Sequence, residues 1–269
     1  DHTEPLGIDK NMPARFLLPL IDQKAASGFV NASLALDQAR AVKDIQEQEL
    51  MRKASHLNDM AMAEITHFFK EGVTETDLAE QLKKIYRDLG ADGLSFEPLF
   101  AFGSNAASGH HWPDDTRLKP GDCILVDIGC TWEGYCSDMT RTFFYKNVTQ
   151  HQQEVYYTVL KANEEAEKAV TPGIPLSSLD QIARGIITDK GYGSAFTHRL
   201  GHFIGLEDHE FGDVSSASAD RAVPGNIFSI EPGIYLENDM GVRVEDLVLV
   251  TDHGHEILNH FSKELTVID

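Results

Sequence analysis

Two acidic residues lie inside one predicted β-hairpin, between Gly121 and Phe144. The stretch GDCILVDIGCTWEGYCSDMTRTFF reads as two β-rich runs that fold back on each other at Trp132-Glu133-Gly134. A turn centred between residues 132 and 133 sets Asp127 and Asp138 directly across from each other. Directly opposed residues have Cβ atoms about 4.5–5.5 Å apart, and like charges there are destabilising. We therefore expect either a protonated acid or a cation between these two side chains.

A second stretch repeats this pattern and supplies two more acids. Residues 224–233 match residues 120–129 at a constant offset of 104, and both contain Pro-Gly, five residues, an acid, one residue and Gly. The acid of the second stretch is Glu231, and its run turns through residues 237–241 so that Glu231 and Glu245 are symmetric about Asn238. The chain thus contains two hairpins and two acid pairs.

Four converging carboxylates indicate a metal site. Without cations their mutual repulsion would be prohibitive, whereas two divalent ions balance four negative charges and can share bridging oxygens. The stretch THRLGHFIGLEDH, residues 197–209, offers a nitrogen ligand. Sites dominated by carboxylates with one imidazole suit Mn²⁺, Co²⁺, Fe²⁺ or Zn²⁺, and we expect Mn²⁺.

Composition narrows the class of protein. The chain has 269 residues, of which 42% are hydrophobic and 25% charged, as is typical of one large globular domain. A formal net charge of -20 argues against nucleic-acid binding, which needs clustered Lys and Arg. No apolar run is long enough to span a membrane, and the first residues do not show the basic and apolar regions of a signal peptide. Three cysteines in no CxxC spacing fit a reducing compartment, so we expect a cytoplasmic location.

Helical patterns precede the first hairpin. Apolar residues recur at spacings of three and four within residues 34–70, which predicts an amphipathic helix that Gly72 ends. Thr74, with Asp77 three residues later, predicts a capping box for a second helix that closes at Gly90.

The same order precedes the second hairpin. Thr149 with Gln152 predicts a cap for a helix that runs to about Val170, and Ser177 or Ser178 is expected to open another that ends near residue 190. At an offset of 101, Gly72, Leu78, Ile85 and Gly90 correspond to Gly173, Leu179, Ile186 and Gly191. The fold class is therefore α+β, with two pseudo-symmetric helix-helix-hairpin halves. Their strands are expected to form one curved antiparallel sheet, with helices outside and the acid pairs at its centre.

The motifs resemble those of a known family. VDIGCTWEGYCSDMTRTF, HRLGHFIGLEDHE, FSIEPGIY and GVRVEDLVLV are similar to motifs of the pita-bread metallopeptidases, most closely the Xaa-Pro dipeptidase (prolidase) and aminopeptidase P branch. The resemblance implies the pita-bread fold and two divalent metal ions. It implies, as metal ligands, Asp127, Asp138, His202, Glu231 and Glu245, with Asp138 and Glu245 bridging the two ions.

The resemblance also implies roles for residues around the metals. Glu231 would take a proton from the attacking water. His110, in the family's His-x-x-Pro position, and His209 would contact the substrate and stabilise the tetrahedral intermediate. His198 and Arg243 match further substrate-binding positions of the Xaa-Pro branch.

The implied reaction is hydrolysis of the peptide bond of Xaa-Pro dipeptides, with a short peptide carrying proline after its first residue as the partner. The resemblance also implies a homodimer. Neither a nucleic acid nor a membrane is expected as a partner. The alternative is an Xaa-Pro aminopeptidase that acts on longer peptides. Less favoured are a non-catalytic peptide-binding member of the fold and a creatinase-like enzyme that works without metals.

The resemblance covers about Leu34 to Asp269. Residues 1–36 are expected to be the tail or linker of an N-terminal domain, and residues 37–269 the catalytic domain. Within the tail, residues 8–9 and 16–21 are expected to be strand or linker pieces around Pro13 and Pro19. Arg199 and Phe203 stand where the family usually has Gly, so we expect their bulk to change the pocket around His202.

Overall fold

The computed structural model describes residues 3–269, in which strands lie between two pairs of helices. The helices are α1 (Ala14–Asp22), α2 (Ser33–Ala41), α3 (Ile45–Thr66), α4 (Glu75–Leu89), α5 (Gln150–Ala169) and α6 (Leu176–Asp189), with 3-10 turns at Gly103–Ala107 and Gly193–Ala195. The strands of the first half are β3 (Gly93–Leu94), β4 (Leu99–Phe102), β5 (Cys123–Ile128), β6 (Cys130–Trp132), β7 (Tyr135–Cys136) and β8 (Met139–Tyr145). Those of the second half are β9 (Gly201–Phe203), β10 (Glu210–Val214), β11 (Ile227–Ile230), β12 (Gly233–Leu236), β13 (Met240–Arg243), β14 (Asp246–Val250) and β15 (His255–Ile257). Two strands, β1 (Leu6–Ile8) and β2 (Phe29–Asn31), lie at one end of the chain, and β16 (Val267–Ile268) lies at the other.

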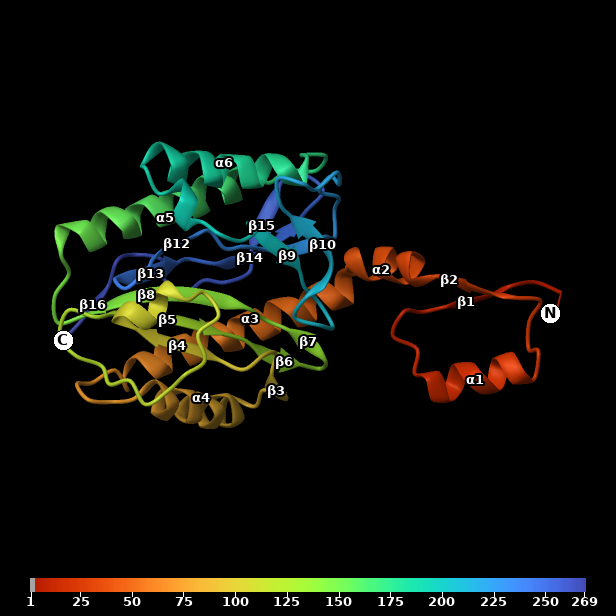
Figure 1. Ribbon diagram of the computed structural model, residues 1–269, viewed down its shortest axis with the longest axis horizontal. Helices are drawn as coiled ribbons and strands as arrows, with labels where there is room; N and C mark the ends of the chain where they lie inside the picture. Colours follow the sequence, from red (N-terminus) through yellow and green to blue (C-terminus); the bar gives the residue numbers. More distant parts are fainter. Residues whose placement is uncertain (1–2) are drawn as a thin grey trace.

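The predicted α+β architecture of two similar halves is confirmed. In Figure 1, α3 and α4 cover one side of the strands and α5 and α6 cover the other. The first half forms a sheet of order β16-β8-β5-β4, and the second half one of order β10-β9-β11-β14-β15. The halves join where Glu245 N donates to Thr140 O at 3.1 Å and Arg243 N donates to Thr142 Oγ1 at 3.2 Å. Within residues 3–269, no helix is long and apolar enough to cross a lipid bilayer.

Backbone details repeat between the halves, as the offset of 101 residues predicted. Gly72 and Gly173 both have left-handed φ values, 81° and 86°, which favour glycine. Their carbonyl oxygens accept hydrogen bonds from Arg117 Nη1 at 2.8 Å and Arg221 Nη1 at 2.6 Å, respectively. An equivalent arginine therefore closes an equivalent turn before α4 and before α6.

The capping signals place most helix boundaries correctly. Thr74 and Asp77 form the predicted capping box of α4, and Thr149 and Gln152 form that of α5. The single helix predicted over residues 34–70 is wrong, because Asp44 caps a new helix and separates α2 from α3. The prediction that Ser177 or Ser178 opens α6 is also wrong, because α6 begins directly after Pro175, whose fixed φ suits the residue before the first turn.

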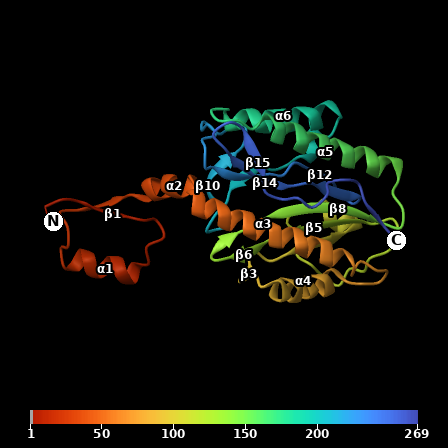
Figure 2. The ribbon, with the colours of Figure 1, turned by 180° about the vertical axis from the view of Figure 1, so that it is seen from behind.

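The segment before α2 extends away from the rest of the molecule (Figures 1 and 2), whereas α2 itself packs against β10. β1 and β2 pair in parallel, and α1 lies beside them without burying any residue. The expectation of a strand or linker over residues 16–21 is wrong, because these residues are helical, with Pro13 immediately before the first turn. Residues 1 and 2 of the expected tail lie outside the described residues, and α2 crosses the predicted boundary at residue 36.

The first hairpin has a register different from the predicted one. Asp127 pairs with Thr140, not with Asp138, because the two-residue turn consists of Glu133 and Gly134, with φ values of 47° and 86°. Two left-handed residues make the tight hairpin turn that matches the twist of the flanking strands. Asp138 is consequently a diagonal neighbour of Asp127. The second hairpin keeps its predicted symmetry about Asn238, since Leu236 pairs with Met240 and Ile230 pairs with Asp246.

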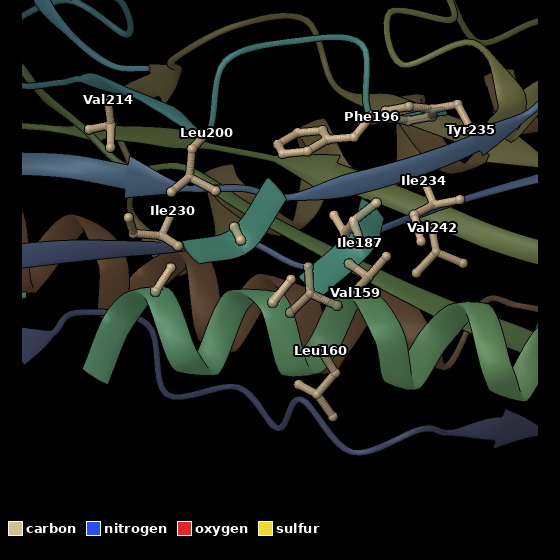
Figure 3. Close-up of a cluster of buried hydrophobic side chains, with 14 of the residues drawn as sticks. Val159, Leu160, Ile187, Phe196, Leu200, Val214, Ile230, Ile234, Tyr235 and Val242 are labelled. Carbon is tan, nitrogen blue, oxygen red and sulfur yellow. The ribbon is translucent and has the colours of Figure 1, made fainter. Parts of the chain in front are cut away.

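The strands of the first hairpin are buried on both faces. Ile124 and Val126 of β5 pack with the core between the sheet and α3–α4, whereas Cys123 and Leu125 pack with the core of the second half. Because side chains alternate along a strand, Asp127 lies on the face shared with Cys123 and Leu125. Figure 3 shows the core of the second half, where side chains of α5, α6 and the second hairpin pack together: Val159, Ile187, Ile230, Ile234 and Val242.

Gly201 allows β9 to approach β11 closely. A Cβ atom at this position would lie 1.8 Å from the carbonyl oxygen of Ser229. The next residue along β9 is His202, so the closeness of these strands also sets the position of the His202 side chain.

We predict that Gly201→Ala lowers the free energy of unfolding by about 1–3 kcal/mol, because the added methyl group forces β9 and β11 apart. The matched control is Gly185→Ala in α6, where a Cβ meets nothing within 4 Å and should stabilise the helix by about 0.5–1 kcal/mol. Denaturant unfolding of both variants checks this. Equal effects of the two substitutions would contradict the close approach at Gly201.

Candidate metal centre

All nine site residues predicted from the sequence line one pocket of about 360 Å³. They come from both halves of the chain, and three of the four acids lie between consecutive strands. Asp138 lies between β7 and β8, Glu231 between β11 and β12, and Glu245 between β13 and β14. The nine residues are His110, Asp127, Asp138, His198, His202, His209, Glu231, Arg243 and Glu245.

Three of the five predicted ligands form a compact buried group. One donor atom each from Asp138, His202 and Glu245 lies within 4.8 Å of the others. His202 Nε2 is 3.5 Å from Asp138 Oδ2 and 3.5 Å from Glu231 Oε1. These separations are long for hydrogen bonds but suit shared coordination, because two atoms each about 2.1 Å from one tetrahedral ion lie about 3.4 Å apart.

Three carboxylates of the site each have one oxygen without a hydrogen-bond partner in residues 3–269. Among the described residues, Asp127 Oδ1, Asp138 Oδ1 and Glu245 Oε1 are buried and accept no hydrogen bond. Burial raises the pKa of Asp138 well above its ordinary value, and the charge of Glu245 raises it further. Burial followed by the charge of Glu231 does the same to the pKa of Glu245. Bound divalent cations would offset both the burial of these charges and their mutual repulsion, so the donor set fits metal ions.

His202 is prepared to act as a neutral ligand. Its Nδ1 lies 3.2 Å from its neighbour's carbonyl oxygen, Phe203 O, which leaves Nε2 facing the carboxylates. Burial, followed by the nearby His209, lowers the pKa of His202 to about 4. An imidazole that is uncharged at neutral pH keeps a lone pair for a metal, and a carbonyl partner on its other nitrogen holds the ring in orientation.

Arg243 ties the two acid pairs together. Its Nη2 donates to Asp127 Oδ2 at 2.6 Å, and its Nε donates to Thr140 Oγ1 at 2.9 Å. The Thr140 hydroxyl in turn donates to Glu245 Oε2 at 2.6 Å. The Nη1 of Arg243 donates to Tyr235 O–H at 2.8 Å and to Gly109 O at 3.2 Å. Groups of the protein itself therefore accept hydrogen bonds from most N–H groups of Arg243, the residue predicted to bind substrate.

Three histidines surround the acids without joining the compact group. His198 Nε2 lies 2.9 Å from the hydroxyl of Tyr235, and its Nδ1 lies 2.7 Å from Arg199 O. The ring of His209 lies 4.0 Å from the ring of His202, centroid to centroid, and its Nδ1 is 2.9 Å from Asp208 Oδ2. His110 lines the pocket beside Trp112, which is 72% exposed.

Sequence reasoning missed two residues of this site. Tyr235 joins His198 and Arg243 through its hydroxyl, and Asp208 bonds His209, whose pKa it raises above the ordinary value. The adjacency of Asp208 to His209 was a visible signal. Nothing local marked Tyr235, because its partners lie on distant segments.

The two residues expected to add bulk behave differently. Arg199 lines the pocket, as expected. Phe203 does not, because side chains alternate along β9 and Phe203 faces opposite to His202, into the core against Phe228. The expectation that Phe203 alters the pocket is therefore wrong.

A buried glutamate anchors the loop that carries His110. Glu75, at the first position of α4, is fully buried. Its Oε1 accepts from Phe102 N at 2.8 Å and Asn105 Nδ2 at 3.0 Å, and its Oε2 lies 2.6 Å from His111 Nε2. The loop before the first hairpin thus converges on one carboxylate, with His111 as the contact next to His110.

A second glutamate anchors the loop that carries His209. Glu210 Oε1 accepts from Leu206 N at 3.0 Å and from Arg40 Nη2 at 2.6 Å. Its Oε2 accepts from Lys43 Nζ at 2.8 Å, and the side chain of Lys43 is only 1% exposed. Burial alone would raise the pKa of Glu210, but the charges of Lys43 and Arg40 bring it below its ordinary value.

Comparison with known proteins identifies the family of this chain. The sequence profile of metallopeptidase family M24 matches residues 49–252. An uncharacterized peptidase of Staphylococcus aureus strain MW2 is 42% identical over 244 residues, which are 91% of this chain and 70% of that protein. The prolidase from Pyrococcus furiosus superposes with a TM-score of 0.91 at 33% identity, covering 97% of this chain and 77% of that one. The X-Pro aminopeptidase from Thermotoga maritima superposes with a TM-score of 0.94 at 33% identity, covering 98% and 76%.

We predict that His111→Ala lowers kcat for peptide hydrolysis by about 10–100-fold, because His110 loses its fixed position. Metal content should not change, since His111 is not among the proposed ligands. His111→Gln can still donate to Glu75 and should restore most of the activity, and His253→Ala, at an exposed histidine, is the matched control. Steady-state kinetics with metal analysis checks this, and loss of metal in His111→Ala would count against it.

We predict that Glu210→Gln lowers the free energy of unfolding at pH 7 by about 3–5 kcal/mol, because the buried Lys43 ammonium loses its counter-charge. The pKa of Glu210 is lowered in the folded state, so its stabilisation exists at neutral pH and is lost as the pH falls below about 4. The gap between wild type and variant should therefore narrow in acid. Denaturant unfolding at pH 7 and at about pH 3, below the ordinary pKa of a glutamate, measures it, and a constant gap would contradict the ion pair.

Proposed function

Because this chain belongs to metallopeptidase family M24, we propose that it is a dinuclear metal-dependent dipeptidase that hydrolyses Xaa-Pro dipeptides. The observation that carries the proposal is the compact group of Asp138, His202 and Glu245 at the base of an accessible pocket. One buried oxygen of Asp138 and one of Glu245 accept no hydrogen bond from the described residues, as expected of ligands for cations.

The proposed ligands are those expected from the sequence. Asp138 and Glu245 would supply carboxylates to hold two divalent ions, and His202 would supply the single nitrogen. Asp127 and Glu231 would complete the set, with the guanidinium of Arg243 orienting Asp127 through the bond of 2.6 Å. Carboxylates with one imidazole favour Mn²⁺ among the possible ions, with Co²⁺, Fe²⁺ and Zn²⁺ as alternatives.

When bound, the ions supply Lewis-acid chemistry, which lowers the pKa of water and polarises a carbonyl group. Glu231, whose pKa burial raises, is suited to accept the proton of the attacking water. His110 and His209 would donate hydrogen bonds to the oxygen that becomes negative as the amide bond is attacked. His198 would orient the substrate, with its ring held by the hydroxyl of Tyr235.

The alternative activity is that of an Xaa-Pro aminopeptidase. Solved structures similar to this chain include both a prolidase and an X-Pro aminopeptidase, at equal identity. The small pocket favours the shorter substrate, since 360 Å³ lies near the lower end of the range of ligand pockets. The complete ligand set disfavours a non-catalytic member of the fold and a creatinase-like enzyme that works without metals.

We predict that chelation abolishes hydrolysis of an Xaa-Pro dipeptide and that Mn²⁺ or Co²⁺ restores it. Asp138→Ala should lower kcat/KM by more than about 100-fold and should lower the number of metal ions bound per chain. This loss exceeds the one expected for a residue that only hydrogen-bonds to a metal ligand. Asp252→Asn, at an exposed acid, is the control. The measurements are metal analysis and kinetics on Xaa-Pro peptides of two to five residues. Full metal occupancy with wild-type turnover in Asp138→Ala would exclude the assignment.

A further inference from the structure

Two guanidinium groups line the pocket, and they differ in availability. Arg243 is 4% exposed, and its donors contact Asp127, Thr140, Tyr235 and the carbonyl of Gly109. No lysine lines the pocket in the described part of the chain. An anionic group of a substrate would therefore have to displace internal bonds to reach Arg243.

Arg199 is the available guanidinium. Its side chain is 36% exposed, and its ion-pair partner in the described residues is Asp213, whose side chain is 52% exposed. An exposed pair of this kind contributes about 0–1 kcal/mol, so exchanging Asp213 for another carboxylate costs little. The planar fork of the guanidinium matches a carboxylate with two parallel hydrogen bonds.

The chain places Arg199 close to the proposed reaction centre. Arg199 follows His198, whose Nδ1 lies 2.7 Å from the Arg199 carbonyl oxygen, and precedes the ligand His202 by three residues. In a dipeptide the terminal carboxylate lies one residue beyond the scissile amide, a distance of about 3.5 Å along the chain. Arg199 lines the same pocket as the proposed ligands, so a peptide group one residue beyond the scissile bond lies in the space that its side chain borders.

We infer that Arg199 is a specificity-determining residue that binds the C-terminal carboxylate of a dipeptide substrate by displacing Asp213. The inference rests on the proposed Xaa-Pro hydrolysis and adds to it a physical reason for preferring dipeptides. A longer peptide has an amide where the dipeptide has a carboxylate, so it gains no charge-assisted bond from Arg199.

The test uses two ligands that cannot be cleaved, an Xaa-Pro dipeptide with a reduced central bond and its C-terminal amide. Calorimetry measures binding of each to the metal-loaded wild type and to Arg199→Gln. We expect Arg199→Gln to weaken binding of the free carboxylate by about 10–100-fold and binding of the amide by less than about 3-fold. kcat/KM for the cleavable dipeptide and its amide should change in the same ratio.

Two matched variants separate recognition from a structural role of the ion pair. Asp213→Asn breaks the same pair but frees the guanidinium, so carboxylate binding should be unchanged or tighter. Arg199→Lys keeps the charge without the fork and should recover part of the affinity. If Asp213→Asn weakens carboxylate binding as much as Arg199→Gln does, the pair only holds the loop and the inference is wrong.

Failure of the two proposals can be told apart. A metal-loaded wild type that cleaves no Xaa-Pro peptide would overturn the proposed function. The ratio of its affinities for the uncleavable carboxylate and amide ligands would still test the role of Arg199. Equal affinity of the wild type for both uncleavable ligands would overturn the role of Arg199, even if both peptides are hydrolysed.

Discussion

The mutual repulsion of buried carboxylates is the constraint on which the rest of this structure depends. Asp138 and Glu245 are buried together, and burial and the neighbouring acids hold both pKa values far above their ordinary range. The protein offsets part of this charge itself, through Arg243 beside Asp127 and the Thr140 hydroxyl beside Glu245. The partnerless oxygens show that this compensation is incomplete, and divalent cations would complete it.

The fold produces this convergence by using one building unit twice. Each half supplies a hairpin that carries two acids, and a strand of the first hairpin bonds directly to the end of a strand of the second at Thr142 and Arg243. Equivalent glycines and arginines close equivalent turns in both halves. The interface between the halves is consequently also the floor of the pocket, so the stability of the fold and the geometry of the site share the same hydrogen bonds.

Two buried glutamates outside the acid cluster hold the loops that surround it. Glu75 organises the loop of His110, and Glu210 organises the loop of His209. Each carboxylate is satisfied by several donors, unlike the acids at the centre. The contrast separates two uses of buried charge in one molecule: fully paired acids fix loops, and partly unpaired acids are available to cations.

The amino-acid sequence alone was sufficient for features that depend on residue type and local spacing. These include the capping boxes of α4 and α5, the internal repeat, the two hairpins and the acids that they carry. Local patterns succeed there because caps and turns are made by residues three or four positions apart. Only the tertiary structure decided that Asp127 opposes Thr140, that Phe203 faces the core and that Arg243 is occupied by protein groups. Those outcomes depend on turn geometry, strand alternation and contacts between segments about a hundred residues apart, which no local pattern records.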